Sequence, residues 1–191
     1  VRNMPKRNVG EARPFLKWVG GKGQLLTELK QLMPKKYGVY FEPFLGGGAL
    51  YFSLKPEKAV LNDLNNHLIT TFKTVKNYPT ELIKSLNKKE AAFFRLGTHE
   101  EKKEMFLKMR AKFNRSDVED LERATLMIFL NKTCFNGMYR ENRRGEFNVP
   151  FGKYINPKIC DSNNISNVSI LLTGATLSMK SFEDAVISAK K

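Results

Sequence analysis

The stretch from residue 39 to residue 52, VYFEPFLGGGALYF, constrains the fold of this chain more than any other. Its apolar start, Val39 to Phe41, predicts a strand over 39–42, and its end predicts a buried helix over about 48–54. Between them lie Gly46, Gly47 and Gly48, whose missing Cβ atoms allow a tight turn and the close approach of a ligand. A strand, a glycine loop and a helix in this order open the nucleotide-type binding unit of α/β proteins.

The surrounding pattern extends this unit into a parallel sheet. A helix over 21–33 precedes it and ends at Pro34, and a short strand over 59–61 follows and runs into Asn62-Asp63. A helix over 65–76, a third strand over 177–179 and a last helix over 181–189 complete the pattern. We therefore expect the α/β class, with a partial Rossmann-like sheet of parallel strands.

The middle of the chain shows helical patterns followed by a hairpin pattern, without the strands of the sheet. Thr80 is expected to cap one helix, a second helix is expected over 100–115, and Ser116 to Glu119 read as a capping box that opens a buried helix through Leu130. Polar and aromatic residues follow over 132–158 and predict a hairpin over about 135–152. We expect one domain from 1–76 with 173–191, and a mostly helical insertion with the hairpin over 77–172.

The charge of the chain points to a polyanionic partner. Its formal net charge is +14, and residues 132–158 hold six basic against two acidic residues. Nucleic acid is the simplest such partner, although a lysine-rich solvated surface gives the same composition. No apolar run reaches the roughly 20 residues of a membrane helix, and no hydrophobic segment follows the basic N-terminus, so we expect a cytoplasmic protein without membrane contact. Cys134 and Cys160 are too few for a disulfide framework, and we expect no metal site.

The residues around the glycine loop suggest an adenosine-type ligand. The loop lacks the Gly-Lys-Ser/Thr ending of a phosphate-binding loop. Asp63 lies 17 residues beyond Gly46, at the end of the next strand, where an acid can accept hydrogen bonds from both ribose hydroxyls. Glu42, at the end of the first strand, is placed to face an amine. The alternative for Asp63 is a purely structural role as the cap of the helix over 65–76.

Three sequence blocks around these residues resemble the Dam-type, D12-class adenine-specific DNA methyltransferases. The blocks are FLKWVGGK (15–22), FEPFLGGG (41–48) and LND (61–63). In that family they build the S-adenosylmethionine pocket. The resemblance implies that Trp18 and Lys22 contact the cofactor, that the loop forms the wall around its amino acid moiety, and that Asp63 holds the ribose. The implied cofactor residues are Trp18, Lys22, Glu42, Pro43, Phe44, Gly46, Gly47, Gly48 and Asp63.

A fourth block, FNGMYRENRRGEFNVPFG (135–152), is similar to the target-recognition hairpin of the same family. Arginines at a protruding turn suit guanine and an asparagine suits adenine. Lysines neutralise phosphates, and an aromatic ring wedges beside an extruded base. We expect duplex DNA as the partner, with GATC as the target, although each side chain alone is equally a solvated loop residue. The candidate DNA contacts are Lys17, Lys132, Asn136, Tyr139, Arg140, Asn142, Arg143, Arg144 and Lys153.

The family's catalytic motif, Asp-Pro-Pro-Tyr, does not occur in these 191 residues. We assign no catalytic residue and expect this chain by itself to transfer no methyl group. Two readings fit. The first is a methyltransferase truncated before the motif that acts as a monomer. A cognate restriction endonuclease system is a possible partner of this first reading, with no direct contact implied. The second is a non-catalytic DNA-binding or cofactor-binding regulator or decoy. We favour the first, because three strands alone leave an apolar sheet edge uncovered.

Overall fold

A three-stranded parallel sheet forms one end of the molecule. The computed structural model describes residues 10–187 and 189. Strands β1 (Tyr40–Glu42), β2 (Ala59–Asn62) and β3 (Ala175–Ser178) lie in the order β1-β2-β3. Both pairs are parallel. The α/β class with parallel strands is therefore confirmed, and the third strand begins two residues earlier than predicted.

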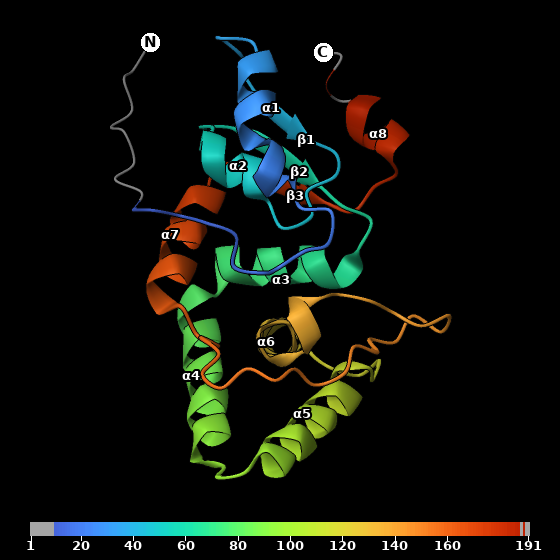
Figure 1. Ribbon diagram of the computed structural model, residues 1–191. Coiled ribbons are helices and arrows are strands. Elements are labelled where there is room, and N and C mark those ends of the chain that lie inside the picture. The colour runs from blue at the N-terminus through green and yellow to red at the C-terminus, as the bar shows by residue number, and fades with distance from the viewer. Residues whose placement is uncertain (1–9, 188, 190–191) are drawn as a thin grey trace.

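Helices surround the sheet and build the opposite end (Figure 1). Near the sheet lie α1 (Leu26–Leu32), α2 (Ala49–Leu54) and α8 (Phe182–Ile187), and the far end holds α4 (Pro79–Arg95), α5 (His99–Phe113) and α6 (Asp120–Thr133). Between the two ends lie α3 (Asn66–Asn77) and α7 (Ser162–Leu172). Within the described part of the chain, no helix has both the length and the apolar content that crossing a bilayer requires.

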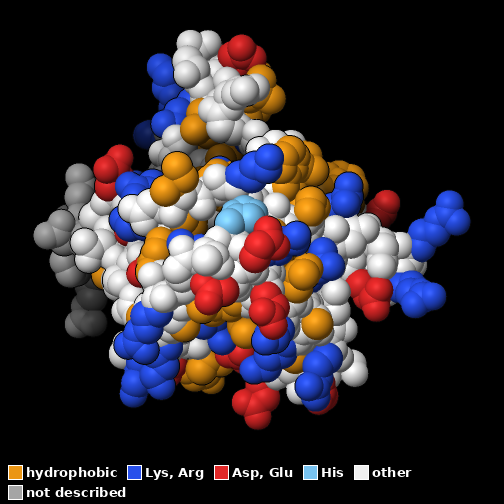
Figure 2. All heavy atoms as spheres, turned by 60° about the horizontal axis from the view of Figure 1, so that its bottom comes forward, with side chains coloured by type: hydrophobic (Ala, Val, Ile, Leu, Met, Phe, Trp, Pro, Cys, Tyr) orange, Lys and Arg blue, Asp and Glu red, His pale blue; other side chains and the backbone are white. Residues whose placement is uncertain are grey.

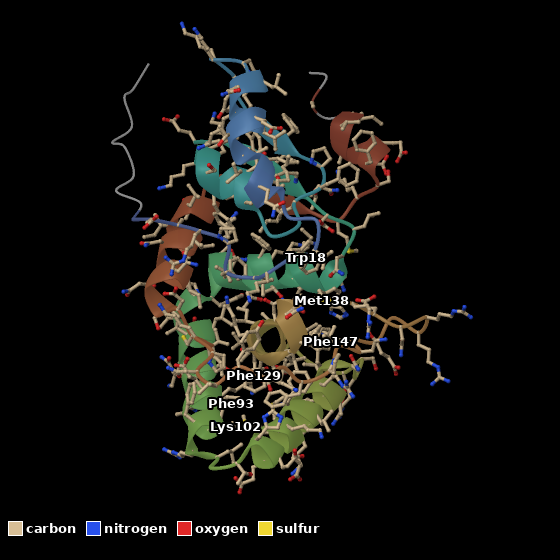
Figure 3. All side chains as sticks on the ribbon, viewed as in Figure 1. Trp18, Phe93, Lys102, Phe129, Met138 and Phe147 are labelled. Carbon is tan, nitrogen blue, oxygen red and sulfur yellow. The ribbon has the colours of Figure 1, made fainter. Side chains whose placement is uncertain are left out.

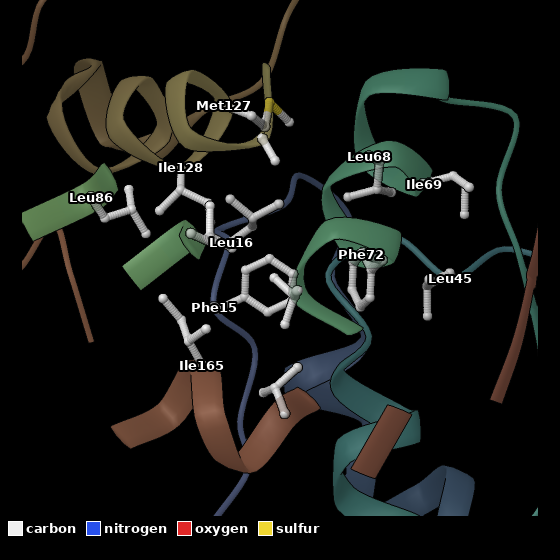
Figure 4. Close-up of a cluster of buried hydrophobic side chains, with 14 of the residues drawn as sticks. Phe15, Leu16, Leu45, Leu68, Ile69, Phe72, Leu86, Met127, Ile128 and Ile165 are labelled. Atoms are coloured by element: carbon white, nitrogen blue, oxygen red, sulfur yellow. The ribbon is translucent and has the colours of Figure 1, made fainter. Parts of the chain in front are cut away.

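One hydrophobic core joins the sheet end to the helical end. Figure 4 shows side chains from α3, α6 and α7 gathered around Phe15, which precedes α1 in the chain. The rings of Phe15 and Phe72 lie 4.8 Å apart. Burying such side chains contributes about 1.5–3 kcal/mol each. The segment before α1 is therefore held by α3, α6 and α7.

Three predicted helix starts differ from the structure. The helix expected over 21–33 is a 3-10 turn, η1 (Lys22–Leu25), followed by α1. Thr80 caps nothing, because α4 already begins at Pro79, a residue suited to the first turn. The capping box at 116–119 is wrong, since α6 begins at Asp120 and Glu119 makes no side-chain capping bond.

A capping box does form in front of α5. The Thr98 hydroxyl accepts a hydrogen bond from the Glu101 amide, and the Glu101 carboxylate accepts one from the Thr98 amide. These bonds satisfy amide groups that the first helical turn leaves without partners. They also lower the pKa of Glu101. The helix expected over 100–115 therefore begins at His99 and ends at Phe113.

The sequence reading gave no element to the residues that form α7. Asp161 caps this helix, and Ile165, Val168, Leu171 and Leu172 are buried on one face. Its Asn, Ser and β-branched residues have low helix propensity, so burial rather than local preference stabilises it. The last helix, expected over 181–189, runs from Phe182 to Ile187 as α8, and Ser188 lies outside the described residues.

The predicted hairpin is present as a narrow projecting turn without regular strands. Glu141 and Phe147 form an isolated antiparallel bridge. The amide of Asn142 donates to the Glu146 carbonyl at 2.9 Å, and the amide of Asn148 donates to the Arg140 carbonyl at 3.1 Å. Figure 1 shows this segment extending away from the body, beside α6. A second isolated antiparallel bridge, between Cys134 and Phe151, closes the base of the hairpin, so two bridges take the place of regular strands.

Candidate functional site

The three parallel strands end at one edge of the sheet, and Asn62 ties the loops that follow β1 and β3 together there. Its side-chain amide nitrogen donates to the carbonyls of Pro43 (3.1 Å) and Lys180 (3.0 Å). Its side-chain oxygen accepts from the Ser178 hydroxyl and the Lys180 amide, both at 2.8 Å. Asn62 is only 2% exposed. The ends of β1 and β3 are therefore fixed relative to each other at the edge where ligands of α/β sheets bind.

The glycine loop requires its glycines for conformation and for packing. Gly46 and Gly48 have φ angles of +52° and +75°, a region that residues with a Cβ rarely adopt. A Cβ on Gly48 would lie 2.8 Å from the Phe52 ring, and one on Gly46 would lie 3.1 Å from the Trp18 ring. The loop is therefore in close contact with α2 on one side and with Trp18 on the other.

Asp63 holds the glycine loop from the end of β2. One carboxylate oxygen accepts the Gly46 amide at 2.9 Å, and the other accepts the Asn65 amide at 3.0 Å. The helix cap of α3 is Asn65, whose side chain accepts the Leu68 amide at 2.8 Å. Asp63 is therefore not the cap of α3. A carboxylate has about four acceptor sites, so Asp63 retains capacity for ligand hydroxyls.

Glu42, at the end of β1, already has an internal cation. Its two carboxylate oxygens bind the Lys22 ammonium (2.8 Å) and the Tyr40 hydroxyl (2.8 Å). Glu42 is 3% exposed, whereas the Lys22 side chain is 31% exposed. Burial, followed by the nearby Glu42 charge, raises the pKa of Tyr40 far above its usual value. The structure thus brings Lys22 and Glu42 together, as two cofactor candidates that contact each other.

Aromatic rings line the outer side of the loop. Trp18 lies over the glycines and stacks on Tyr139, with ring centroids 4.9 Å apart and planes at 18° (Figure 3 labels Trp18). Phe44 stacks on Phe182, with centroids 5.3 Å apart and planes at 9°. Both rings of this second pair are exposed. Phe182 did not figure in the sequence reasoning, because its partner lies 138 positions earlier in the chain.

Two buried asparagines hold the backbone of the segment before Trp18. Asn131 of α6 accepts from the Lys17 amide and donates to the Lys17 carbonyl, both at 2.9 Å. Asn164 of α7 makes the same pair of bonds with Arg13, both at 3.0 Å. These two residues were also missed, although Asn131 stands directly after the apolar run of α6, which is an unusual place for a polar side chain.

Basic side chains gather where this segment meets α6 and α7. Partial burial, and then the charge of Lys17, lowers the pKa of Lys132. Arg13 and Lys158 belong to the same group, and both pair with Asp161, at 2.7 and 3.0 Å. One carboxylate therefore faces several cations. Such an excess of positive charge favours an anion.

The candidate DNA-contacting residues of the hairpin differ in whether their side chains are bonded within it. The Arg140 side chain donates to the side-chain oxygen of Asn148 at 2.8 Å. Asn142 organises the turn: its side chain accepts the amides of Arg144 (2.9 Å) and Glu146 (3.0 Å). Arg143 and Arg144 are exposed and make no side-chain bond with any described residue. Figure 2 shows Lys and Arg side chains at the projecting tip.

The remaining candidates lie at the base of the hairpin. Asn136 and Lys153 are exposed, and Asn136 has the unusual φ of +54°. Its neighbour Phe135, which the sequence reasoning passed over, is 49% exposed. An exposed aromatic ring beside a basic surface is suited to stacking on a base.

The cysteines and acidic residues form no metal centre within the described ranges 10–187 and 189. Cys134 and Cys160 are buried free thiols. Burial raises the pKa of Cys134 to about 11, so its thiol stays protonated and unreactive at neutral pH.

Comparisons with known proteins place the chain among DNA methyltransferases. The family model described as "D12 class N6 adenine-specific DNA methyltransferase" matches residues 18–191. The chain is similar to "Type II methyltransferase M.MjaIII" of Methanocaldococcus jannaschii (42% identity over 91% of this chain and 63% of the relative). It is also similar to "Type II methyltransferase M1.LlaDCHI" of Lactococcus lactis subsp. cremoris (40% identity over 98% of this chain and 65% of the relative). A third relative is the "DNA adenine methylase" of Escherichia coli strain K12 (37% identity over 76% of this chain and 49% of the relative).

The chain thus spans less than two thirds of the length of these three relatives. The family match, in contrast, covers most of the chain and includes the glycine loop, Asp63 and the hairpin. On this evidence the chain belongs to the D12 class of N6 adenine-specific DNA methyltransferases.

Proposed function

We propose that this chain is the cofactor-binding and target-recognition portion of an adenine-N6 DNA methyltransferase that uses S-adenosylmethionine. The observation that carries the proposal is the meeting of Trp18, Gly46 and Asp63 at the carboxyl edge of a parallel sheet. Asp63 accepts the Gly46 amide at 2.9 Å, and a Cβ on Gly46 would lie 3.1 Å from the Trp18 ring. A loop, an acid and an aromatic ring in this arrangement suit an adenosine compound.

The residues present fit this cofactor. Asp63 has acceptor capacity left for ribose hydroxyls. The stacked rings of Phe44 and Phe182 offer an exposed aromatic face for adenine. Lys22 and Pro43 hold the ends of the loop through Glu42 and Asn62, so their proposed role is to shape the pocket. When bound, S-adenosylmethionine supplies an electrophilic methyl group.

The proposed DNA surface joins the hairpin to the basic residues at its base. Arg143 and Arg144 lie in the turn beyond the Glu141–Phe147 bridge and are suited to reading guanine edges of a GATC site. Arg140 and Asn142 shape the turn as well as lining it. Asn136 is proposed to contact the backbone. Lys17, Lys132 and Lys153 are proposed to neutralise phosphates, a sequence-independent contribution.

The chemistry requires an acceptor for the proton of the adenine amine, which the family takes from Asp-Pro-Pro-Tyr. Residues 1–191 contain no such motif, so we propose that this chain binds cofactor and DNA without transferring the methyl group. We further propose that it acts as a monomer in the cytoplasm and belongs to a restriction-modification system, without direct contact to the cognate endonuclease. The proposed domain boundaries are 1–76 plus 173–191 and 77–172. The second candidate, a regulator or decoy, has the same binding properties.

Methyl transfer and DNA binding test the proposal together. The 191-residue chain is incubated with methyl-labelled S-adenosylmethionine and either a GATC duplex or a duplex of scrambled sequence, and binding to each is followed by fluorescence anisotropy at several salt concentrations. We expect tighter binding to the GATC duplex, loss of that preference in Arg144→Ala, and no label in the DNA. Equal binding to both duplexes contradicts the target, and label in the DNA contradicts the assignment of this chain as non-catalytic.

A further inference from the structure

We propose that Tyr139, on the recognition hairpin, is a positioning residue for the cofactor site. It acts through Trp18, so that DNA at the hairpin and S-adenosylmethionine at the glycine loop strengthen each other's binding. The inference rests on the proposed function, and it adds a physical connection between the two sites. One stacked pair of rings makes that connection.

The Trp18 ring lies between the two sites. On one side it is in contact with the glycine loop, where a Cβ on Gly46 or Gly47 would come within 3.1 or 3.3 Å of the Trp18 side chain. On the other side it stacks on Tyr139, with centroids 4.9 Å apart and planes at 18°. A displacement of either neighbour therefore moves this ring or uncovers one of its faces.

Tyr139 is in turn bound to the hairpin. Its hydroxyl donates to the Glu141 carboxylate, and its ring lies 5.7 Å from that of Phe147, on the returning arm. Figure 3 shows Phe147 below Trp18, toward the helical end. Burial raises the pKa of Tyr139 far above its usual value, so the hydroxyl remains a donor at neutral pH. A hairpin ordered on DNA consequently fixes the position of the Tyr139 ring.

A cavity of about 480 Å³ lies between the same two regions, which shows that the hairpin and the end of β2 are not packed solidly together. Asp63, Asn65, Glu141 and Gly145 are among its lining residues. This open space leaves room for a shift of the hairpin relative to the end of β2. The stacked rings are a contact through which such a shift reaches the glycine loop, and the Tyr139 hydroxyl also interacts with the Asn65 side chain near Asp63.

The backbone before Trp18 is held independently of the ring. Asn131 binds the amide and the carbonyl of Lys17, and it also donates to the Gly137 carbonyl at 2.9 Å. The position of the Trp18 ring over the loop is therefore set mainly by its side-chain contacts. Those contacts come from the cofactor loop and from Tyr139.

The size of the coupling follows from the contact that carries it. One aromatic pair supplies about 0.5–1.5 kcal/mol, so DNA is expected to tighten cofactor binding by about two- to tenfold. Linkage requires the cofactor to tighten DNA binding by the same factor. The sign is positive, because DNA that orders the hairpin holds Tyr139, and hence Trp18, in the position that closes the loop.

Trp18 is the only tryptophan of the chain, so its emission reports on this contact directly. The affinity for S-adenosylmethionine is measured with and without saturating GATC duplex, by Trp18 emission and by calorimetry, in the wild type, Tyr139→Leu and Tyr139→Phe. Tyr78→Leu, an exposed tyrosine before α4, is the matched control, and thermal unfolding checks the fold of every variant.

We expect the duplex to increase the affinity for S-adenosylmethionine about two- to tenfold in the wild type, in Tyr139→Phe and in Tyr78→Leu. In Tyr139→Leu, the affinities with and without the duplex should agree within about twofold. DNA alone should also change the Trp18 emission of the wild type but not of Tyr139→Leu. A Tyr139→Leu variant that binds DNA more weakly yet keeps the wild-type ratio overturns the inference, since it reveals only a direct DNA contact. A wild-type emission that bound DNA leaves unchanged also overturns it. Absence of cofactor binding in the wild type instead contradicts the proposed function, and the DNA-induced emission change still decides the inference.

Discussion

Lys22 and Glu42 form an ion pair at the carboxyl end of β1, with 2.8 Å between the ammonium nitrogen and a carboxylate oxygen. The two residues are unequally buried, since Glu42 is 3% exposed and the Lys22 side chain is 31% exposed. If the pair is broken, Lys22 can reach water, whereas Glu42 cannot. The pair therefore stabilises a buried carboxylate at the start of the glycine loop.

Removing the lysine should consequently cost more stability than neutralising the acid. Lys22→Met leaves the Glu42 charge buried with only the Tyr40 hydroxyl, and we expect a loss of about 3 kcal/mol in the free energy of unfolding. Glu42→Gln should cost about 1–2 kcal/mol. Urea unfolding of both variants measures the difference, and a larger loss in Glu42→Gln contradicts this account of the pair.

Lys132 should lower the stability of the folded protein and strengthen its binding to DNA. Its pKa lies below the ordinary value of about 10.5, because the folded state disfavours its charged form. The charged lysine therefore lowers the stability of the fold at neutral pH. This loss of stability becomes smaller as the pH rises through the folded pKa. We expect Lys132→Met to raise the unfolding midpoint by about 2–4 °C, which corresponds to about 1 kcal/mol. The same variant should lose affinity equally for GATC and scrambled duplexes. Lys108→Met, on the exposed side of α5, is the control.

His67 should make the interface between α3 and α5 sensitive to acid. Its ring lies 4.8 Å from that of Phe113, its Nδ1 is buried without a partner among the described residues, and burial followed by Arg123 lowers its pKa. The unfolded chain therefore gains a proton near pH 6.5 that the folded chain resists, and stability falls as the pH drops below that value.

His67→Phe removes this titrating group and keeps a ring against Phe113. As the pH is lowered from 7.5 to 5.5, the wild type should lose unfolding free energy relative to this variant. The relative loss should be at most about 1.4 kcal/mol per pH unit. Urea unfolding across this range measures it. A difference that is constant with pH would show that His67 titrates alike in both states.

The two backbone-binding asparagines should differ in their effect on Trp18. Asn131→Leu and Asn164→Leu each remove two hydrogen bonds to the segment before α1, and each should cost about 2–3 kcal/mol of stability. Only Asn131→Leu should shift the Trp18 emission, because Lys17 is the neighbour of Trp18 and Arg13 is not. Equal emission shifts in the two variants would mean that the whole segment moves as one unit.

The local signals of the site were readable in the sequence, and the distant contacts were not. The strand, the glycine loop and Asp63 follow one another within 25 residues, so their spacing alone predicted that they lie together. The stack of Trp18 on Tyr139 joins residues 121 positions apart, and Asn131 reaches Lys17 across 114. Helix α7 escaped prediction because burial overrides the low propensity of its residues.

The capping boxes illustrate how such a signal is misread. Thr98 and Glu101 carry the same pattern as Ser116 and Glu119, and only the first pair forms the motif. Near the second pair, Arg115 binds Asp117, and Arg123 donates to the carbonyls of Arg115, Ser116 and Val118. These bonds hold the residues before α6 in a loop, so the helix starts later than the pattern indicated.

The measurement that tests the central claim most directly is the binding of S-adenosylmethionine to this chain and to Asp63→Asn, by isothermal titration calorimetry, with Glu104→Gln on exposed α5 as the control. An amide keeps one acceptor oxygen and loses the charge, so the account predicts saturable one-to-one binding to the wild type and to the control. It predicts binding about 10- to 100-fold weaker in Asp63→Asn, with the fold retained. No saturable binding to the wild type, or equal affinity in Asp63→Asn, would contradict the claim that Trp18, the glycine loop and Asp63 form the cofactor pocket.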